Sequence, residues 1–98
     1  MVKLKIISDK QEDITEIIKS AISAEIKRLE IGLNRTNREI KGFEERYKVP
    51  SEKFLKEFTA EDLQGGDDEY IRWTGELKIR DKILDELKKL KDIEYVNC

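Results

Sequence analysis

The acidic run Asp67-Asp68-Glu69, directly after Gly65-Gly66, is the one candidate metal site that the residue types suggest. Carboxylate oxygens are the ligands that hard cations such as Mg²⁺ and Ca²⁺ prefer. The run lacks the spacing of a calcium-binding loop and a distant glutamate that would complete the coordination. Acidic residues here also suit a helix start, because they accept hydrogen bonds from exposed amides and complement the helix dipole. We therefore interpret the run as structural and predict no metal site.

Residue types that usually carry catalysis are missing or isolated. The chain has no histidine, which removes the usual base of a nucleophilic site and the commonest metal ligand. Its only cysteine, Cys98, is the last residue and has no second thiol to pair with. Gly65-Gly66 is not followed by the lysine and hydroxyl residue of a phosphate-binding loop. We predict a protein that is not an enzyme and that uses no cofactor.

The charge balance also limits the partners. Charged residues make up 43% of the 98 residues, and the net charge is −2. An acidic balance disfavours non-specific binding to nucleic acid, since that binding depends on neutralising phosphates. The sequence has neither a signal-peptide pattern nor an apolar run of membrane-spanning length. We expect a soluble cytoplasmic protein with no membrane partner.

One long amphipathic pattern forms the scaffold for these residues. Apolar side chains recur at intervals of three or four from Ile14 to Tyr47, which predicts a helix with one buried face. Residues 32–37 lower the helix propensity, and Thr36 with Glu39 matches a capping pair, so a break there is an alternative. We favour one helix over residues 13–48, because the stripe keeps its phase through this region.

The remaining elements are shorter. Residues 1–8 alternate between apolar and basic side chains, which predicts a strand or arm. Pro50 ends the long helix, and residues 51–63 form a short helix with Phe54 and Phe58 inside. Residues 92–98 are predicted as a tail or, as the alternative, as a strand beside residues 2–7. A returning helix over residues 68–91 has a buried side marked by Tyr70, Trp73, Leu77, Leu84, Leu87 and Leu90.

The fold predicted from these elements is mainly α and has a single domain over residues 1–98. The three helices form an antiparallel helical hairpin, with a short N-terminal strand and the alternative of a C-terminal strand. Long helices with a narrow apolar stripe bury little surface in one chain. We therefore expect a homo-oligomer, a dimer or a tetramer, to complete the core.

The bend of the hairpin is predicted at a fold corner. A glycine there supplies a positive φ, and an aspartate begins the returning helix. The aromatic residues one turn further on lock the bend; as a pair they would also suit a binding hot spot, but aromatic residues on a buried stripe more often belong to the core. The corner residues are Gly65, Gly66, Asp67, Asp68, Tyr70 and Trp73.

Several motifs follow the order of a known pattern: Phe43-Glu44-Glu45-Arg46-Tyr47, Ser51-Glu52, Phe54 and Phe58, Gly66-Asp67-Asp68-Glu69, and Trp73. Over roughly residues 25–90 the chain resembles small, largely uncharacterised archaeal and bacterial helical proteins that are often regarded as antitoxin-like partners of a small toxin. Lys48 stands where those proteins usually have glycine, and Arg72 where acidic residues are common. The resemblance implies a shared helical fold and, as an expectation, the antitoxin role.

Two other functions fit the residues. Lys3 and Lys5 on a strand that precedes a helix are similar to the start of a ribbon-helix-helix repressor, in which paired strands enter the major groove. This alternative is a DNA-binding autorepressor that uses these two lysines. The other alternative is a plain coiled-coil structural oligomer. Our first hypothesis is a protein–protein interaction module whose helix surfaces cover a toxin.

Overall fold

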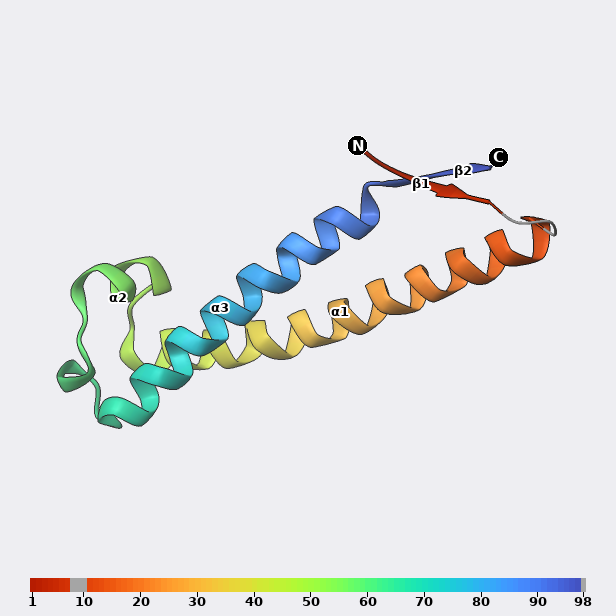
Figure 1. Cartoon of the computed structure of the whole chain (residues 1–98). Helices are drawn as coiled ribbons and strands as arrows, with labels where there is room; N and C mark the ends of the chain where they lie inside the picture. The colour runs from red at the N-terminus through yellow and green to blue at the C-terminus, as the bar shows by residue number, and fades with distance from the viewer. Residues whose placement is uncertain (8–10, 98) are drawn as a thin grey trace.

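The computed structural model describes residues 1–7 and 11–97, so the expectation for Cys98 lies outside the described residues. The elements follow in the order β1 (Val2–Ile6), α1 (Gln11–Tyr47), α2 (Ser51–Glu57), a short 3₁₀ helix η1 (Ala60–Asp62), α3 (Gly66–Lys91) and β2 (Ile93–Asn97). Helices α1 and α3 pack against each other as an antiparallel hairpin (Figure 1). The predicted mainly α fold with an N-terminal strand is confirmed, and of the two alternatives for residues 92–98 the strand is the one that forms.

Helix α1 runs without a break through the region that lowers helix propensity. Thr36 and Ile40 are buried in its stripe, which keeps its phase on both sides of the doubtful segment. Gly32 faces α3, where a Cβ would lie 3.7 Å from the Cδ1 atom of Ile83, an ordinary van der Waals contact. Packing of the stripe against α3 thus outweighs the weak local propensity.

The end of α1 is closed by a Schellman-type turn. Lys48 has a φ of 55°, and the amide of Val49 donates a hydrogen bond of 3.2 Å to the carbonyl of Glu44. Val49 is buried in the same cluster as Phe43, which supplies the apolar contact that accompanies this motif. The chain therefore turns at Lys48, before Pro50, and uses a non-glycine residue in the left-handed region.

We predict that Lys48→Gly stabilises the protein by about 1 kcal/mol, because glycine adopts a positive φ without the steric penalty that a Cβ brings. Urea denaturation followed by circular dichroism would measure this gain. The matched control is Lys41→Gly, an exposed position inside α1. There glycine is expected to destabilise the protein by about 1 kcal/mol. Equal destabilisation by both substitutions would contradict the prediction.

The predicted short helix over residues 51–63 is divided into two pieces. Helix α2 ends at Glu57, and Phe58 has extended backbone angles. A capping box then begins η1, in which the amide and the hydroxyl of Thr59 both donate to the carboxylate of Asp62. Because these side-chain hydrogen bonds hold Thr59 outside a helix, α2 ends earlier than the apolar spacing predicts.

Helix α3 begins at Gly66, before the predicted start at residue 68. Gly66 has a φ of 60°, and Gly65 is the N-cap residue, with no side chain to form the cap. Asp67 and Asp68 lie within the first turn, where their charges complement the helix dipole. The helix start is thus defined by the two glycines, and neither aspartate is the N-cap.

The two strands form a parallel two-stranded ribbon at the open end of the hairpin (Figure 1). Val2 stands beside Ile93, and Lys3 beside Glu94. A two-stranded ribbon is marginally stable alone, so it depends on a surface to pack on. The buried Ile6 and the ammonium of Lys19, which lies 5.3 Å from the centre of the Tyr95 ring, indicate that this surface is α1.

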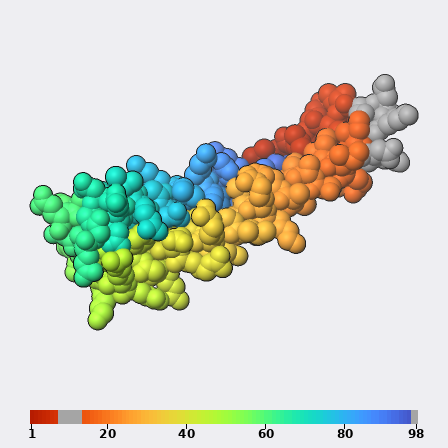
Figure 2. Space-filling model, turned by 90° about the horizontal axis from the view of Figure 1, so that it is seen from below, coloured from red at the N-terminus to blue at the C-terminus, as the bar shows by residue number. Residues whose placement is uncertain are grey.

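The molecule is long and thin, with extents of 61 × 20 × 18 Å. Helix α1 is longer than α3, and its N-terminal part extends past the end of α3 (Figures 1 and 2). In this part, Lys19 of α1 lies against the Tyr95 ring of the ribbon. None of the helices in the described part of the chain has the length and apolar character that a membrane span requires.

Candidate functional site

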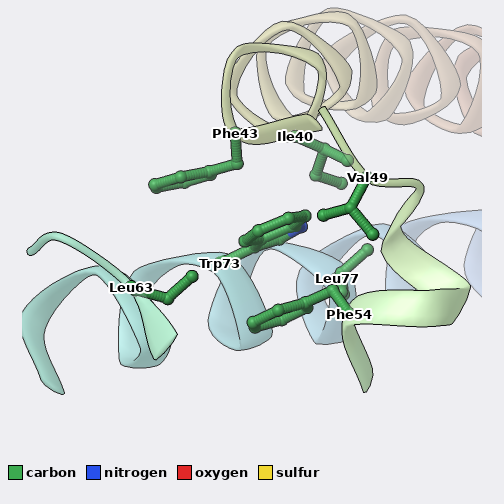
Figure 3. Close-up of a cluster of buried hydrophobic side chains, with 7 residues drawn as sticks. All are labelled: Ile40, Phe43, Val49, Phe54, Leu63, Trp73 and Leu77. Carbon is green, nitrogen blue, oxygen red and sulfur yellow. The ribbon is translucent and has the colours of Figure 1, made fainter. Parts of the chain in front are cut away.

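The corner is built around a three-layer aromatic stack. The indole of Trp73 is fully buried and lies between the ring of Phe43 from α1 and the ring of Phe54 from α2 (Figure 3). The centroid of the indole lies 3.8 Å from that of Phe54 and 5.4 Å from that of Phe43, with near-parallel planes. Aromatic stacking joins α1, α2 and α3 at one point and makes the corner rigid.

A polar chain orients the same indole. The Nε1–H group of Trp73 donates to the hydroxyl of Ser51 at 3.0 Å, and that hydroxyl donates to the carboxylate of Glu44 at 2.7 Å. The same carboxylate oxygen of Glu44 accepts the amide of Ser51 at 2.9 Å, which supplies the cap that the start of α2 otherwise lacks. These bonds satisfy the buried donors, so the indole has one position.

Glu69 connects the start of α3 to the end of α1. Its carboxylate accepts hydrogen bonds from the amide of Gly65 at 3.0 Å, from the hydroxyl of Tyr47 and from the guanidinium of Arg46. The hydrogen bond from Tyr47 is the main cause that holds the pKa of the Glu69 carboxyl below its ordinary value of 4.5, while burial acts in the opposite direction. A Cβ at Gly65 would lie 2.2 Å from the Cγ of Glu69, so a glycine is needed for this approach.

We predict that the Glu69 carboxylate stabilises the fold in a pH-dependent way. A carboxyl whose pKa is lower in the folded state contributes fully above its unfolded-state pKa, and the contribution is lost as the pH falls through the folded-state pKa. Glu69→Gln is therefore expected to lower the Tm by about 5 °C at pH 7, and the difference from wild type should shrink below pH 4.5. Thermal melts between pH 3 and pH 7 would measure it.

The control for this experiment is Glu61→Gln. Glu61 is exposed and makes no ion pair with another residue that the structure describes. The Tm of the Glu61→Gln variant should stay close to that of wild type over the whole pH range. A Tm difference between Glu69→Gln and wild type that is constant with pH would show that the charge of Glu69 does not stabilise the fold.

A groove of about 230 Å³ lies on the outer side of the corner. Its lining includes Gly42 and Phe43; a methyl group at Gly42 would meet nothing within 4 Å, so the groove is open there. Its charged lining consists of three arginines and two glutamates, which gives one excess positive charge. The lining residues are Arg38, Glu39, Gly42, Phe43, Arg46, Glu69 and Arg72.

The three guanidinium groups of the groove are held in different ways. Arg46 is paired with the nearly buried Glu69. Arg72 lies 3.7 Å from the carboxylate of Glu39, and its guanidinium carbon lies 5.5 Å from the centre of the Phe43 ring. Arg38 is exposed and makes no ion pair with another described residue. Two arginines are thus pre-oriented and one is free, which suits the binding of a carboxylate.

The residues predicted as the fold corner lie together at the closed end of the hairpin, around Gly65 and Trp73. Asp67 and Asp68 are exposed at the helix start, and Tyr70 packs with its ring 5.3 Å from that of Phe54. In the residues that the structure describes, no group of three histidine, cysteine, aspartate or glutamate side chains could hold a metal ion. Lys3 and Lys5 are exposed on β1, at the opposite end of the molecule (Figure 1).

Sequence reasoning missed the contacts that Glu44, Arg46 and Glu69 make across the corner. Glu69 precedes Trp73 by four residues, so a charged residue occupies the buried stripe of α3. A charged residue on a buried stripe requires a partner, and that signal pointed to a polar contact across the corner. Glu44 and Arg46 lie close to the end of α1. The residues that they contact depend on the turn at Lys48, which sets the direction of the chain after α1.

No protein-family model, curated protein or solved structure matches this chain. The resemblance to antitoxin-like proteins has no support from these comparisons and stays a prediction.

Proposed function

We propose that this chain is a non-enzymatic, cytoplasmic protein–protein interaction module that docks on a small toxin and neutralises it. The sequence resemblance supports the class of partner. The observation that carries the docking proposal is the groove lined by Arg38, Arg46 and Arg72 beside a rigid corner. Its excess positive charge and its guanidinium groups favour an acidic side chain of the partner.

The geometry supports a simple docking mechanism. An acidic side chain that enters the groove meets the free guanidinium of Arg38 and the exposed, pre-oriented guanidinium of Arg72. Arg46 keeps donors beyond the bond that it makes to Glu69, since a guanidinium carries five N–H groups. Because the aromatic stack fixes the corner before binding, little conformational entropy is lost when the partner docks. The toxin is neutralised because the helix surfaces cover its working face.

The homo-oligomer predicted from the sequence is part of the same proposal. The monomer leaves large apolar side chains exposed on both long helices, among them Ile17, Ile31 and Ile71, with exposed fractions of 64–66%. A second copy would cover part of this surface. The groove lies at the closed end of the hairpin and stays accessible if the copies meet near the open end.

The structure gives less support to the alternatives. Glu94 on β2 stands beside Lys3 in the ribbon, so the face that would enter DNA carries mixed charge. A plain coiled-coil scaffold leaves the arginine-lined groove without a role. A gel shift on the protein's own promoter, repeated with Lys3→Ala/Lys5→Ala, tests the repressor. Salt-sensitive binding that this double variant abolishes would favour the repressor over our proposal.

The test of the proposed function uses the protein encoded next to this chain in its native operon. The two proteins are co-expressed, and this chain is purified through a tag. We expect the neighbour to co-purify and its inhibition of growth to be relieved. The double variant Arg38→Glu/Arg72→Glu should reduce the retained neighbour about tenfold or more, because two of the three groove guanidiniums are replaced by carboxylates.

A matched control is Lys78→Glu/Lys82→Glu on α3, which makes the same change in charge outside the groove at two exposed lysines. This variant should retain the neighbour as well as wild type does. A chain that never retains the neighbour contradicts the proposed function. Equal loss in both double variants contradicts the role of the groove, because only the overall charge would then matter.

A further inference from the structure

A second apolar stripe follows the outer side of the N-terminal part of α1. Ile17 and Ile31 have exposed fractions of 66% and 64%, and Ile14 is 37% exposed. Ala21 and Ala24, which are exposed as well, continue the line between them. Spacings of three, four, three and seven residues place all five on one face of the helix. Ile18 and Ile22, which are partly buried, lie outside this stripe.

The chain exposes more surface than a compact monomer of its mass. The accessible surface is 7352 Å². A compact monomer of 11.6 kDa is expected to expose about 5,800 Å². The excess of about 1,500 Å² is larger than the roughly 800 Å² that each partner contributes to a standard interface. The radius of gyration of 19.2 Å, against about 13 Å for a compact chain of this length, agrees with this surplus.

The stripe is complementary to itself when two copies lie antiparallel. A two-fold axis between Ile22 and Ser23 places Ala21 opposite Ala24 of a second copy, and Ile14 opposite its Ile31. Small residues at the centre let the two helices approach closely, and larger apolar residues fill the ends. In this arrangement the two hairpins extend in opposite directions from the contact, so neither corner is covered by the other copy.

Charge selects the antiparallel orientation. Arg28 lies on the line of the stripe between Ala24 and Ile31, and a parallel pair would place two copies of it side by side. In the antiparallel pair it meets Ile17, and its charge is already paired with Glu25 through two hydrogen bonds of 2.7 and 2.6 Å.

Two charged residues beside the stripe also favour the antiparallel pair. Glu16 and Lys27 are exposed on this flank and make no ion pair with other described residues. In the antiparallel pair, Lys27 of one copy lies on the same side of the contact as Glu16 of the other, about 3 Å further along the helix axis. Within one copy they are eleven residues apart, about 16 Å along the helix.

We infer that this chain forms a two-fold symmetric dimer through the outer stripe of α1, with the second copy of the chain as the occupant. The dimer rests on the self-association in the proposed function and does not depend on the toxin. It keeps the arginine-lined grooves of the two copies at opposite ends of one long particle. Each dimer can therefore bind two partner molecules.

The first test is sedimentation of the full chain over a range of concentrations. We expect a dimer, and we expect Ala24→Glu to weaken its Kd about tenfold or more, because a charge is placed at the centre of the apolar contact. Since Ala24 is exposed and glutamate is a good helix former, the variant should fold like wild type, which circular dichroism checks. The control is Lys78→Glu on α3, which should leave the Kd unchanged.

A charge exchange tests the contact between copies. Glu16→Lys and Lys27→Glu should each weaken the Kd about fivefold, since each places like charges at two symmetric contacts. The double variant Glu16→Lys/Lys27→Glu should restore the wild-type Kd. Restoration requires contact between two copies, because the two residues are too far apart in one chain to interact. A double variant that is weaker than both single variants overturns the arrangement.

Disulfide formation tests the orientation. In a Cys98→Ser background, chains with Ala21→Cys are mixed with chains with Ala24→Cys and oxidised. The antiparallel dimer predicts that the mixed disulfide predominates, because these two positions lie opposite each other. Predominance of the Ala21→Cys homodimer would indicate parallel helices and overturn the inference.

The outcomes separate this inference from the proposed function. A wild-type chain that sediments as a monomer at the highest concentration overturns the dimer and the self-association, while the neighbour still co-purifies if the docking proposal is correct. A wild-type dimer that Ala24→Glu leaves unchanged overturns only the choice of surface.

Discussion

Replacing Trp73 with alanine is expected to lower the free energy of unfolding by about 3–5 kcal/mol. The indole is fully buried, and its removal leaves a cavity between the rings of Phe43 and Phe54. It also removes the Nε1–H group that donates a hydrogen bond to the hydroxyl of Ser51 in the folded protein. Because domains of this size are stable by only about 5–15 kcal/mol, the variant should unfold at much lower urea concentration. Urea denaturation followed by circular dichroism measures the change.

Two controls separate the contributions at this position. Trp73→Phe keeps an aromatic ring in the stack but removes the Nε1–H donor, and we expect an intermediate loss of about 1–3 kcal/mol. Ile71→Ala changes a residue on the same helix that is 65% exposed, and its effect should stay within about 0.5 kcal/mol. If Trp73→Ala and Ile71→Ala had similar effects, the indole would not hold the corner together.

The general fold could be predicted from the sequence because its signals are periodic. The stripe from Ile14 to Tyr47 favours one helix, the alternation at residues 1–8 predicts a strand, and a strand was one of two alternatives for residues 92–98. Leu84 shows the limit of this reasoning: its spacing predicted a buried side chain, but it is 47% exposed. Two helices alone cover only a narrow stripe, and residues at its margin remain open when no third layer covers them.

The details of the corner could be predicted only in part. Apolar spacing placed Trp73 on the buried side of α3, and the paired glycines indicated a bend. Spacing does not show which donor satisfies a polar atom, and so it did not reveal the contacts of Glu69 with Gly65 and Tyr47. The groove depends on side chains from α1 and α3 that meet only after the hairpin has formed. A charged residue on a buried stripe signals that a partner exists, but the spacing in a single sequence does not identify that partner.

Phe54→Ala is expected to lower the free energy of unfolding by about 3–5 kcal/mol, a loss similar to that of Trp73→Ala. Phe54 is fully buried and is the residue of α2 whose ring stacks on the indole, at 3.8 Å between centroids. A helix of seven residues is not stable alone, so α2 keeps its structure only through such contacts. Hydrogen exchange should therefore show lost protection in α2 and η1 before any loss in the middle of α1.

A double-mutant cycle tests whether the two rings act as one unit. The free-energy loss in Phe54→Ala/Trp73→Ala should be smaller than the sum of the two single losses by about 1–2 kcal/mol, since each single variant already removes the stacking contact. The comparison pair is Phe54→Ala with Leu87→Ala, a buried residue of α3 outside the aromatic cluster. Those two losses should add within about 0.5 kcal/mol. Full additivity between Phe54 and Trp73 would mean that α2 is held by contacts other than the stack, and the protection pattern in η1 would then be independent of the indole.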